Sequence, residues 1–490
     1  MNIKYIFLIA LLPVLAVSCY KDKSNTSELI LPEVSVTGFQ PGYTVFTHQD
    51  MLDIAPAVEN ESLFDFYWTL YSTNFNVQEG VVPRADTIAR TRALHYEVLL
   101  NPGAYILIFN VRNKTTGVTE LLTSKLQVST LTMSGWYFLK DDGANTDFDF
   151  VYPDGRIDNW IAFFNGGRNL PGKAVKAVYA PAFKSTPTSS DLYNAFVVLS
   201  EQDAVICRID NGEIKFDFDN MFFTKPAVRK LQNVVQPMIN NIVTIINDNK
   251  PYTLTKGGLF ANFPPSSYRL APQLGVAGLV MGFDQQSKTV INLDNANYTA
   301  LGASGDALKN MNAELVWSIG YSGLRSMAAL LFRHPSGNGS FYKLNATYGH
   351  MAGWTTPLIA DVKTVPAGHG LLAASIIAGN YDADYYYYAQ GNKLYLTDLA
   401  SLTENLQLEL PAGEEITCVQ HVKYPQPAAN VLYTTDYLAI ASYSAGHYKI
   451  WLHRISSTGT VQPLAQPNYE GSGRVSCINY LENGIGARIF

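Results

Sequence analysis

The chain has 490 residues, which is too long for one ordinary compact domain and enough for two or three. Only 16% of the residues are charged and 12% are aromatic, which excludes a disordered chain or a coiled coil and favours an all-β fold. The net charge of -6 argues against a non-specific nucleic-acid binder, so no nucleic-acid partner is expected.

The N-terminus is typical of a secretory signal. Lys4 precedes an uncharged apolar run over 5–17, which is too short to span a bilayer as a helix, and Ser18 stands just before Cys19. This pattern predicts a lipoprotein signal peptide over 1–18 and lipidation of Cys19, which anchors the chain in a membrane. Leu15 lies one place further from Cys19 than the lipoprotein pattern expects, so an ordinary signal with a chance cysteine is the alternative. No other stretch resembles a membrane span.

A polar tether over 19–28 precedes a first predicted domain over 29–130. Short strands are expected at 33–37, 64–70, 103–111 and 121–128, with a hairpin turn over 113–117 between the last two. About 100 residues of short strands predict an immunoglobulin-like sandwich, with Trp68 as a candidate core residue. No cysteine pair accompanies Trp68, which favours a PKD-like or fibronectin-like variant.

From 133 to 490 a hairpin unit recurs: an apolar strand, a polar turn and a second strand. We count seven such units, about 49 residues apart on average, which is the blade period of a β-propeller. They lie at 135–151, 195–209, 242–254, 278–293, 328–344, 385–396 and 437–453. The segment 474–480 is expected to complete the blade begun near Trp136 and so close the ring. A series of unrelated β-domains is the alternative.

Three further cysteines, Cys207, Cys418 and Cys477, lie inside predicted strands. Buried free thiols are expected, with a Cys418–Cys477 bridge as the alternative.

The sequence Ser18-Cys19-Tyr20-Lys21-Asp22-Lys23 resembles the start of PKD-like family lipoproteins of the Bacteroidota, and 135–139 resembles the strand that opens their second part. The layout is also similar: a lipidated cysteine, a PKD-like sandwich and a long C-terminal β-domain. The resemblance implies an accessory protein of a SusC/SusD-type outer-membrane importer. It implies location in the outer membrane, at the cell surface or on the periplasmic leaflet, and delivery of a peptide or glycan to a TonB-dependent channel.

No catalytic motif, cofactor motif or metal-ligand spacing is apparent, and we predict no catalytic residue, metal or cofactor. Acidic residues gather at 141–154, in turns that favour aspartate for its geometry. Asp142, Asn145 and Asp147 have a spacing that suits calcium, but the distal ligands of such a loop are missing. His447 and His453 are expected at the surface or in loops.

Aromatic side chains are the better binding candidates, because rings stack on sugars and on peptide side chains. Alternation along 385–388 places two of the four tyrosines on each face of a strand. Packing between blades is the competing role for every ring. The candidates are Trp136, Trp160, Trp317, Trp354, Tyr386 and Tyr388.

These observations predict a non-enzymatic, lipid-anchored binding protein with a sandwich stalk and a propeller head. A surface hydrolase acting on glycan or peptide is one alternative, and a structural or adhesive envelope protein is another.

Overall fold

The computed structural model describes residues 34–73, 84–184, 186, 192–236, 243–254, 258–262, 267–276, 280–293, 299–300, 303–321, 327–345, 358–424 and 435–490. The chain divides into two compact units. One contains 34–43, 51–96 and 104–126, and the other contains 44–50, 97–103 and 127–490. No helix in the described ranges is long and apolar enough to cross a membrane. The predicted signal peptide, Cys19 and the tether lie outside these ranges.

The first unit is built on a five-stranded sheet. Its strands, in spatial order, are Gly42–Phe46 (β2), Thr119–Ser129 (β9), Gly103–Asn113 (β8), Phe64–Ser72 (β5) and Asp86–Ala89 (β6). Two small sheets accompany it, pairing Val36–Thr37 (β1) with Ala57–Val58 (β4) and Met51–Ile54 (β3) with Leu94–Glu97 (β7). A 3-10 turn, Glu61–Leu63 (η1), leads into β5.

The predicted core and hairpin of this unit are confirmed. Trp68 is fully buried, and its ring lies 4.5 Å from that of Phe109 on the adjacent strand. The Trp68 Nε1 donates a hydrogen bond to the Thr91 carbonyl at 3.0 Å, which satisfies the one polar atom of the buried indole. Between β8 and β9, Gly117 N donates to the Asn113 carbonyl at 2.9 Å and closes the expected turn.

Among the described residues, the strands of the second unit form seven sheets. The first contains Gly155–Ile157 (β12), Asn145–Tyr152 (β11), Gly135–Asp141 (β10), Arg474–Glu482 (β38) and Ile485–Gly486 (β39), with Leu170–Pro171 (β13) beside β11. The second contains Ala174–Lys184 (β14), Leu192–Ser200 (β15), Ala204–Arg208 (β16) and Ile214–Asp217 (β17). The third contains Leu231–Val235 (β18), Thr244–Asn247 (β19), Lys250–Leu254 (β20) and Phe260–Ala261 (β21).

The remaining four sheets repeat the same meander. The fourth contains Leu270–Val276 (β22), Val280–Asp284 (β23), Thr289–Asn292 (β24) and Thr299–Ala300 (β25). The fifth contains Glu314–Tyr321 (β26), Met327–Arg333 (β27), Gly339–Asn345 (β28) and Ile359–Val365 (β29). The sixth contains Ile376–Gly379 (β30), Tyr385–Gln390 (β31), Lys393–Asp398 (β32) and Glu404–Glu409 (β33). The seventh contains Glu415–Lys423 (β34), Asp436–Ser444 (β35), His447–His453 (β36), Tyr469–Ser472 (β37) and Arg488–Ile489 (β40).

In the described part of this unit, helical structure is limited to short pieces. They are Trp160–Phe164 (α2), Ala303–Leu308 (η2) and Gly370–Leu372 (η3).

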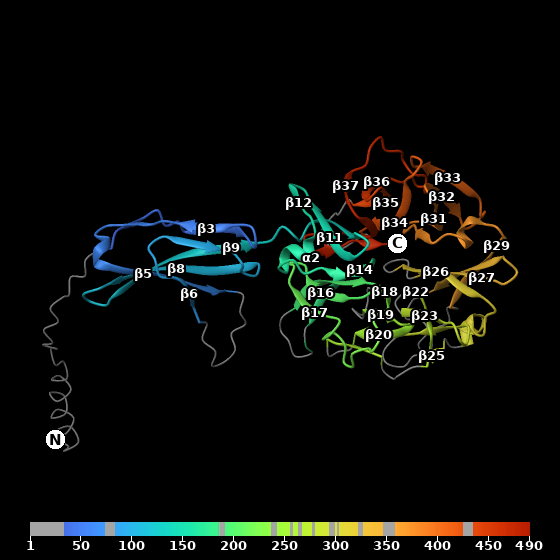
Figure 1. The fold of residues 1–490 in the computed structure, drawn as a ribbon, viewed down its shortest axis with the longest axis horizontal. Helices are drawn as coiled ribbons and strands as arrows, with labels where there is room; N and C mark the ends of the chain where they lie inside the picture. The colour runs from blue at the N-terminus through green and yellow to red at the C-terminus, as the bar shows by residue number, and fades with distance from the viewer. Residues whose placement is uncertain are drawn as a thin grey trace, which may run out of the picture. The chain divides into compact units, whose positions relative to one another are not determined.

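Each of the seven hairpins predicted from the sequence is present, and each lies in a different sheet. They pair β10 with β11, β15 with β16, β19 with β20, β23 with β24, β27 with β28, β31 with β32, and β35 with β36. The sheets follow one another around a centre, where the C-terminus lies (Figure 1).

The expected closure is also present. Strand β38, from the end of the chain, pairs antiparallel with β10, so that Trp136 lies opposite Tyr480 and Phe138 opposite Ile478. The first sheet therefore takes its inner strand from the C-terminus and its outer strands from residues 135–157. This arrangement is propeller-like, and it leaves β10 without a free edge.

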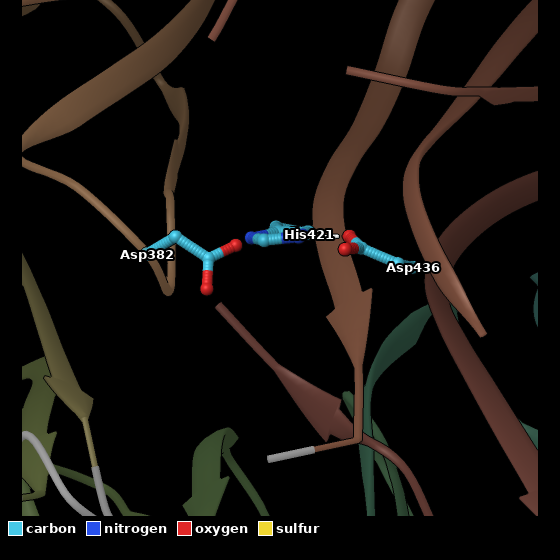
Figure 2. Close-up of side chains that lie close together, drawn as sticks. All are labelled: Asp382, His421 and Asp436. Carbon is cyan, nitrogen blue, oxygen red and sulfur yellow. Dashed lines mark hydrogen bonds and ion pairs between the residues drawn. The ribbon is translucent and has the colours of Figure 1, made fainter. Parts of the chain in front are cut away.

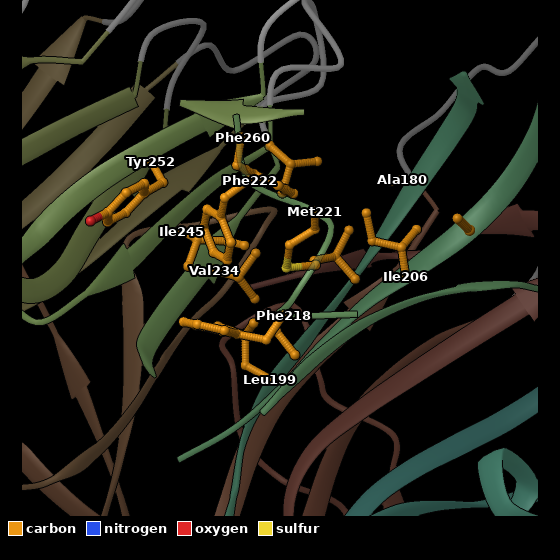
Figure 3. Close-up of a cluster of buried hydrophobic side chains, with 14 of the residues drawn as sticks. Ala180, Leu199, Ile206, Phe218, Met221, Phe222, Val234, Ile245, Tyr252 and Phe260 are labelled. Atoms are coloured by element: carbon orange, nitrogen blue, oxygen red, sulfur yellow. The ribbon is translucent and has the colours of Figure 1, made fainter. Parts of the chain in front are cut away.

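One apolar cluster fills the space between each pair of neighbouring sheets, including the last and the first. Successive side chains of a strand point to opposite faces of its sheet, so each sheet contributes to two clusters. On β15, Val197 faces the third sheet, whereas Phe196 and Val198 face the first. Figure 3 shows the cluster between the second and third sheets, where Phe218, Phe222 and Phe260 meet. Both faces of every sheet are thus buried, and each large apolar side chain contributes about 1.5–3 kcal/mol.

Candidate functional site

A cavity of ≈ 430 Å³ lies at the centre of the second unit. Residues of the inner strands β14, β18, β22, β26, β30, β34 and β38 line it, and the C-terminal segment 487–490 forms part of its wall. Its size falls in the usual range for small-ligand pockets. Because it draws on every sheet, its shape depends on closure of the whole ring.

A recurring bulge shapes the wall of the cavity. In every inner strand except β30, the pairing register shifts near the start of the strand. A bulge adds one unpaired residue and re-aims the side chains beside it. The residues that follow it include Lys176, Trp317, Cys418 and Cys477, and all four line the cavity.

The charged side chains that line the cavity are both cations, and the C-terminal carboxyl of Phe490 lies on the same wall. Lys176 and Arg488 line it, whereas none of its described lining residues is an aspartate or glutamate. Neither cation makes an ion pair with any described residue. Lys176 is half-buried and lines the cavity, and burial lowers its pKa. Burial also lowers the pKa of Arg488, to about 10.

Neutral polar groups make up much of the remaining wall. Gln420 is fixed in place, because its Oε1 accepts hydrogen bonds from Ile478 N at 2.7 Å and from the Cys418 thiol at 3.3 Å. The Oγ atoms of Ser318 and Ser476 are buried and have no hydrogen-bond partner in the described part of the chain. Unsatisfied buried hydroxyls of this kind commonly mark a place for water or a ligand.

All three cysteines outside the signal region are buried and free. The expected core thiols are therefore present, and Cys418 and Cys477 do not form the alternative bridge. Burial raises the pKa of both Cys207 and Cys418, which keeps their sulfurs protonated and unreactive.

Most of the aromatic binding candidates serve packing instead. Trp160, Tyr386 and Tyr388 are at most 1% exposed, and Trp136 is 6% exposed. Each ring lies in an apolar cluster between two sheets, so none presents a face to a ligand. These four residues therefore have the alternative role considered in the sequence analysis, which is packing between blades.

The tyrosine run shows why the prediction failed. As expected, the tyrosine rings point alternately to the two faces of the strand: Tyr386 and Tyr388 face the fifth sheet, and Tyr387 faces the seventh. Both faces of the sixth sheet are covered, however, so the second face is another core rather than a surface. Of the remaining candidates, Trp317 is half-buried and lines the cavity, whereas Trp354 lies outside the described residues.

The acidic cluster at 141–154 is structural. Asp142 Oδ1 accepts hydrogen bonds from the backbone N–H of Ala144 and Asn145, and these bonds lower its pKa. Asp147 accepts backbone hydrogen bonds from Ile161 and Ala162 at the start of α2. These hydrogen bonds give the two carboxylates structural roles, Asp142 in a turn and Asp147 at the start of α2.

Asp149 is the most deeply buried acid of that cluster. Lys140 lies 2.8 Å from its Oδ1, and Arg156 and Tyr448 both donate to Oδ2, at 2.7 and 2.8 Å. Its charge is therefore compensated from both the first and the seventh sheets.

A second group resembles a metal site in its donors. The ligand atoms of Asp382, His421 and Asp436 lie within 4.8 Å of one another. Figure 2 shows the three side chains, with His421 between the two aspartates. His421 is fully buried; its Nδ1 accepts from Tyr381 N at 2.9 Å, which leaves Nε2–H to donate to Asp436 Oδ1 at 2.9 Å.

Lys423 occupies the position that a cation would take. Its Nζ lies 2.6 Å from Asp382 and 2.9 Å from Asp436. Both ring nitrogens and both carboxylates of the group thus have protein partners, so the residues do not fit a metal ion. The group joins the sixth sheet to the seventh.

The two histidines expected at the surface differ. His447 is exposed, but His453 is 3% exposed, and its Nδ1 lies 2.7 Å from the Gln462 carbonyl. The prediction is therefore wrong for His453, which ends β36 beneath the 455–462 segment.

Residues 19–179 match the PKD-like family. No curated protein matches the chain. Among solved structures, it is similar to a quinonprotein alcohol dehydrogenase-like protein of Bacteroides thetaiotaomicron, with 12% identity and a TM-score of 0.44 over 91% of this chain and 98% of that one.

Two eukaryotic propeller domains are also similar. One is the β-propeller domain of Myceliophteria thermophila Cps50, with 8% identity and a TM-score of 0.34 over 65% of this chain and 98% of that one. The other is the WD40 domain of SCAP from fission yeast, with 12% identity and a TM-score of 0.31 over 60% and 66%. None of these likenesses bears on activity.

The general features of the expected fold class are therefore confirmed. The chain is all-β, with a PKD-like N-terminal part and a propeller-like second unit.

Proposed function

We propose that this protein is a lipid-anchored, non-enzymatic binding protein of the outer membrane. Its second unit is a seven-bladed propeller that binds part of a peptide or glycan in the central cavity. It acts as an accessory of a SusC/SusD-type importer.

The central cavity is the observation that supports a binding role. It has a volume of ≈ 430 Å³, and its wall combines the half-buried Trp317, two hydroxyls without a partner among the described residues, and two cations. Convergent polar groups beside an apolar ring surface are typical of a small-ligand site. Three acids of the 141–154 cluster, Asp142, Asp147 and Asp149, are held by hydrogen bonds and ion pairs away from this cavity.

Anchoring supports the importer role. A lipidated Cys19 would confine the binding unit beside its partner and raise the effective concentration of that partner. The match of residues 19–179 to the PKD-like family agrees with the resemblance on which this role rests.

The test is recovery of the native lipoprotein from outer membranes in mild detergent, followed by mass spectrometry. Stoichiometric recovery of a TonB-dependent channel with its SusD-type partner is expected. The matched control is Cys19→Ser, which removes the acylated residue and leaves residues 34–490 unchanged, and it should lose the membrane association. Recovery of the protein alone would overturn the importer role and make hydrolysis assays the next step.

A further inference from the structure

We propose that the central cavity recognises a carboxylate group on its ligand, and that Lys176 and Arg488 are the recognising residues. The ligand is an acidic saccharide unit or a peptide with a free carboxyl end. This inference rests on the proposed binding function, since it names the chemical class of ligand for the same site.

The first argument is charge. A buried cation without a counter-ion is costly, and proteins normally pair it or place it in water. Here two cations from different strands, β14 and β40, line one cavity, and its described lining contains no acidic side chain. A ligand carboxylate would supply the ion-pair partner that neither half-buried cation has among the described residues.

The charged and titratable neighbours do not supply it. A carboxyl oxygen of Phe490 accepts from His421 N at 3.0 Å, and no carboxylate of the described residues lies within ion-pair distance of Lys176 or Arg488. Tyr179 donates its hydroxyl to the Gly484 carbonyl at 2.8 Å, and burial raises its pKa to about 12, so it stays neutral. The Cys418 thiol is protonated for the same reason.

The second argument is the chemistry of the rest of the wall. The unpartnered hydroxyls of Ser318 and Ser476 offer hydrogen bonds to the polar atoms that surround a carboxylate in a sugar or a peptide. Trp317 offers an apolar ring surface on the same cavity level as Lys176, because both follow the bulge of their strand. Arginine and lysine differ in geometry, so Arg488 suits a forked contact and Lys176 a point contact.

The experiment is isothermal titration of the full chain carrying Cys19→Ser, with paired probes. Digalacturonic acid is compared with its diamide, and N-acetyl-Gly-Phe with its amide. We expect one acidic probe to bind at least tenfold more tightly than its neutral partner, and the pair that responds identifies the source of the carboxylate. The neutral partners keep the size and shape of the acids, so the difference reports the charge.

Variants connect the preference to the residues. Lys176→Met should reduce affinity for the acidic probe at least tenfold and remove its advantage over the neutral partner. Lys173→Met, an exposed lysine three residues away on the same segment, should change neither. Arg488→Met provides a second test, and circular dichroism checks that each variant is folded.

Equal binding of acidic and neutral probes, unchanged binding in Lys176→Met, or no binding of either acid would each overturn this inference. The importer test is independent of these outcomes. Failure here with an intact importer complex leaves the proposed function standing, whereas loss of that complex removes the function itself.

Discussion

The Tyr448 hydroxyl donates a hydrogen bond to Asp149 Oδ2 at 2.8 Å, although the two residues are 299 positions apart in the sequence. Tyr448 belongs to the seventh sheet and Asp149 to the first, and Arg156 Nη2 contacts both of them. This buried network therefore joins the two sheets where the ring closes.

Tyr448→Phe should destabilise the protein by about 2 kcal/mol, because a buried carboxylate loses a charge-assisted hydrogen bond while the ring remains. Urea unfolding measures the change. Tyr469→Phe on the neighbouring strand β37 is the control, since its hydroxyl has no hydrogen bond among the described residues, and it should cost little. Equal losses in both variants would contradict a specific role for the Asp149 contact.

Asp436 should stabilise the folded protein at neutral pH, and this stabilisation should be lost in acid. Burial alone would raise its pKa, but hydrogen bonds from His421 and Lys423 prevail and hold the pKa at about 2. The unfolded carboxyl titrates near pH 4, so this contribution is complete above about pH 4 and is lost as the pH falls toward 2. Asp436→Asn should be less stable at pH 6 and lose less stability on acidification. Parallel curves for the two proteins would refute this.

Asp147 should make the folded protein less stable as the pH rises, which is the opposite of the effect of Asp436. Burial raises its pKa to about 6, although backbone hydrogen bonds from Ala162, Ile161 and Phe148 oppose the shift. The folded state holds the proton more tightly, so stability falls as the pH rises from about 4 to 6. Chemical unfolding at several pH values should show this slope in the wild type and in Asp154→Asn, an exposed control, but not in Asp147→Asn. A slope that survives in Asp147→Asn would assign it to another group.

Lys176→Met should stabilise the ligand-free protein. The substitution removes an ammonium group that burial disfavours and keeps a flexible side chain of similar length. We expect a higher melting temperature than in the wild type, and no change in Lys173→Met. A lower melting temperature would mean that Lys176 has a stabilising structural partner.

Thiol titration tests the state of the cysteines. In the Cys19→Ser protein, we expect three thiols, Cys207, Cys418 and Cys477, to react with Ellman's reagent only after denaturation, because all three are buried and free. Detection of a single thiol in the denatured, unreduced protein would instead reveal a disulfide.

The sequence was sufficient to predict the seven central hairpins, because their middle strands are apolar and their turns are polar. It was insufficient for the inner strands, where bulges break the alternation near residues such as Val175 and Thr417. Four of the six aromatic candidates are packing residues for a related reason. Tyr386 and Trp160 have the composition of a binding surface, but stacking of the sheets buries both faces.

The sequence around the cavity residues contains little that would identify them as a binding site. Lys176 lies within a largely apolar strand, and a lysine at such a position is usually exposed at a sheet surface. Only the three-dimensional arrangement shows that β14 is an inner strand and that Arg488 lies on the wall of the same cavity.

The pairing of β10 with β38 has a consequence for biosynthesis. About 340 residues separate the two strands, and contacts at such separations form slowly and late. A polypeptide that stops before residue 474 would expose the edge of β10 and the apolar faces beside it, which are features that chaperones and proteases recognise. Completion of the ring therefore depends on residues that are synthesised last, because β38 covers the edge of β10.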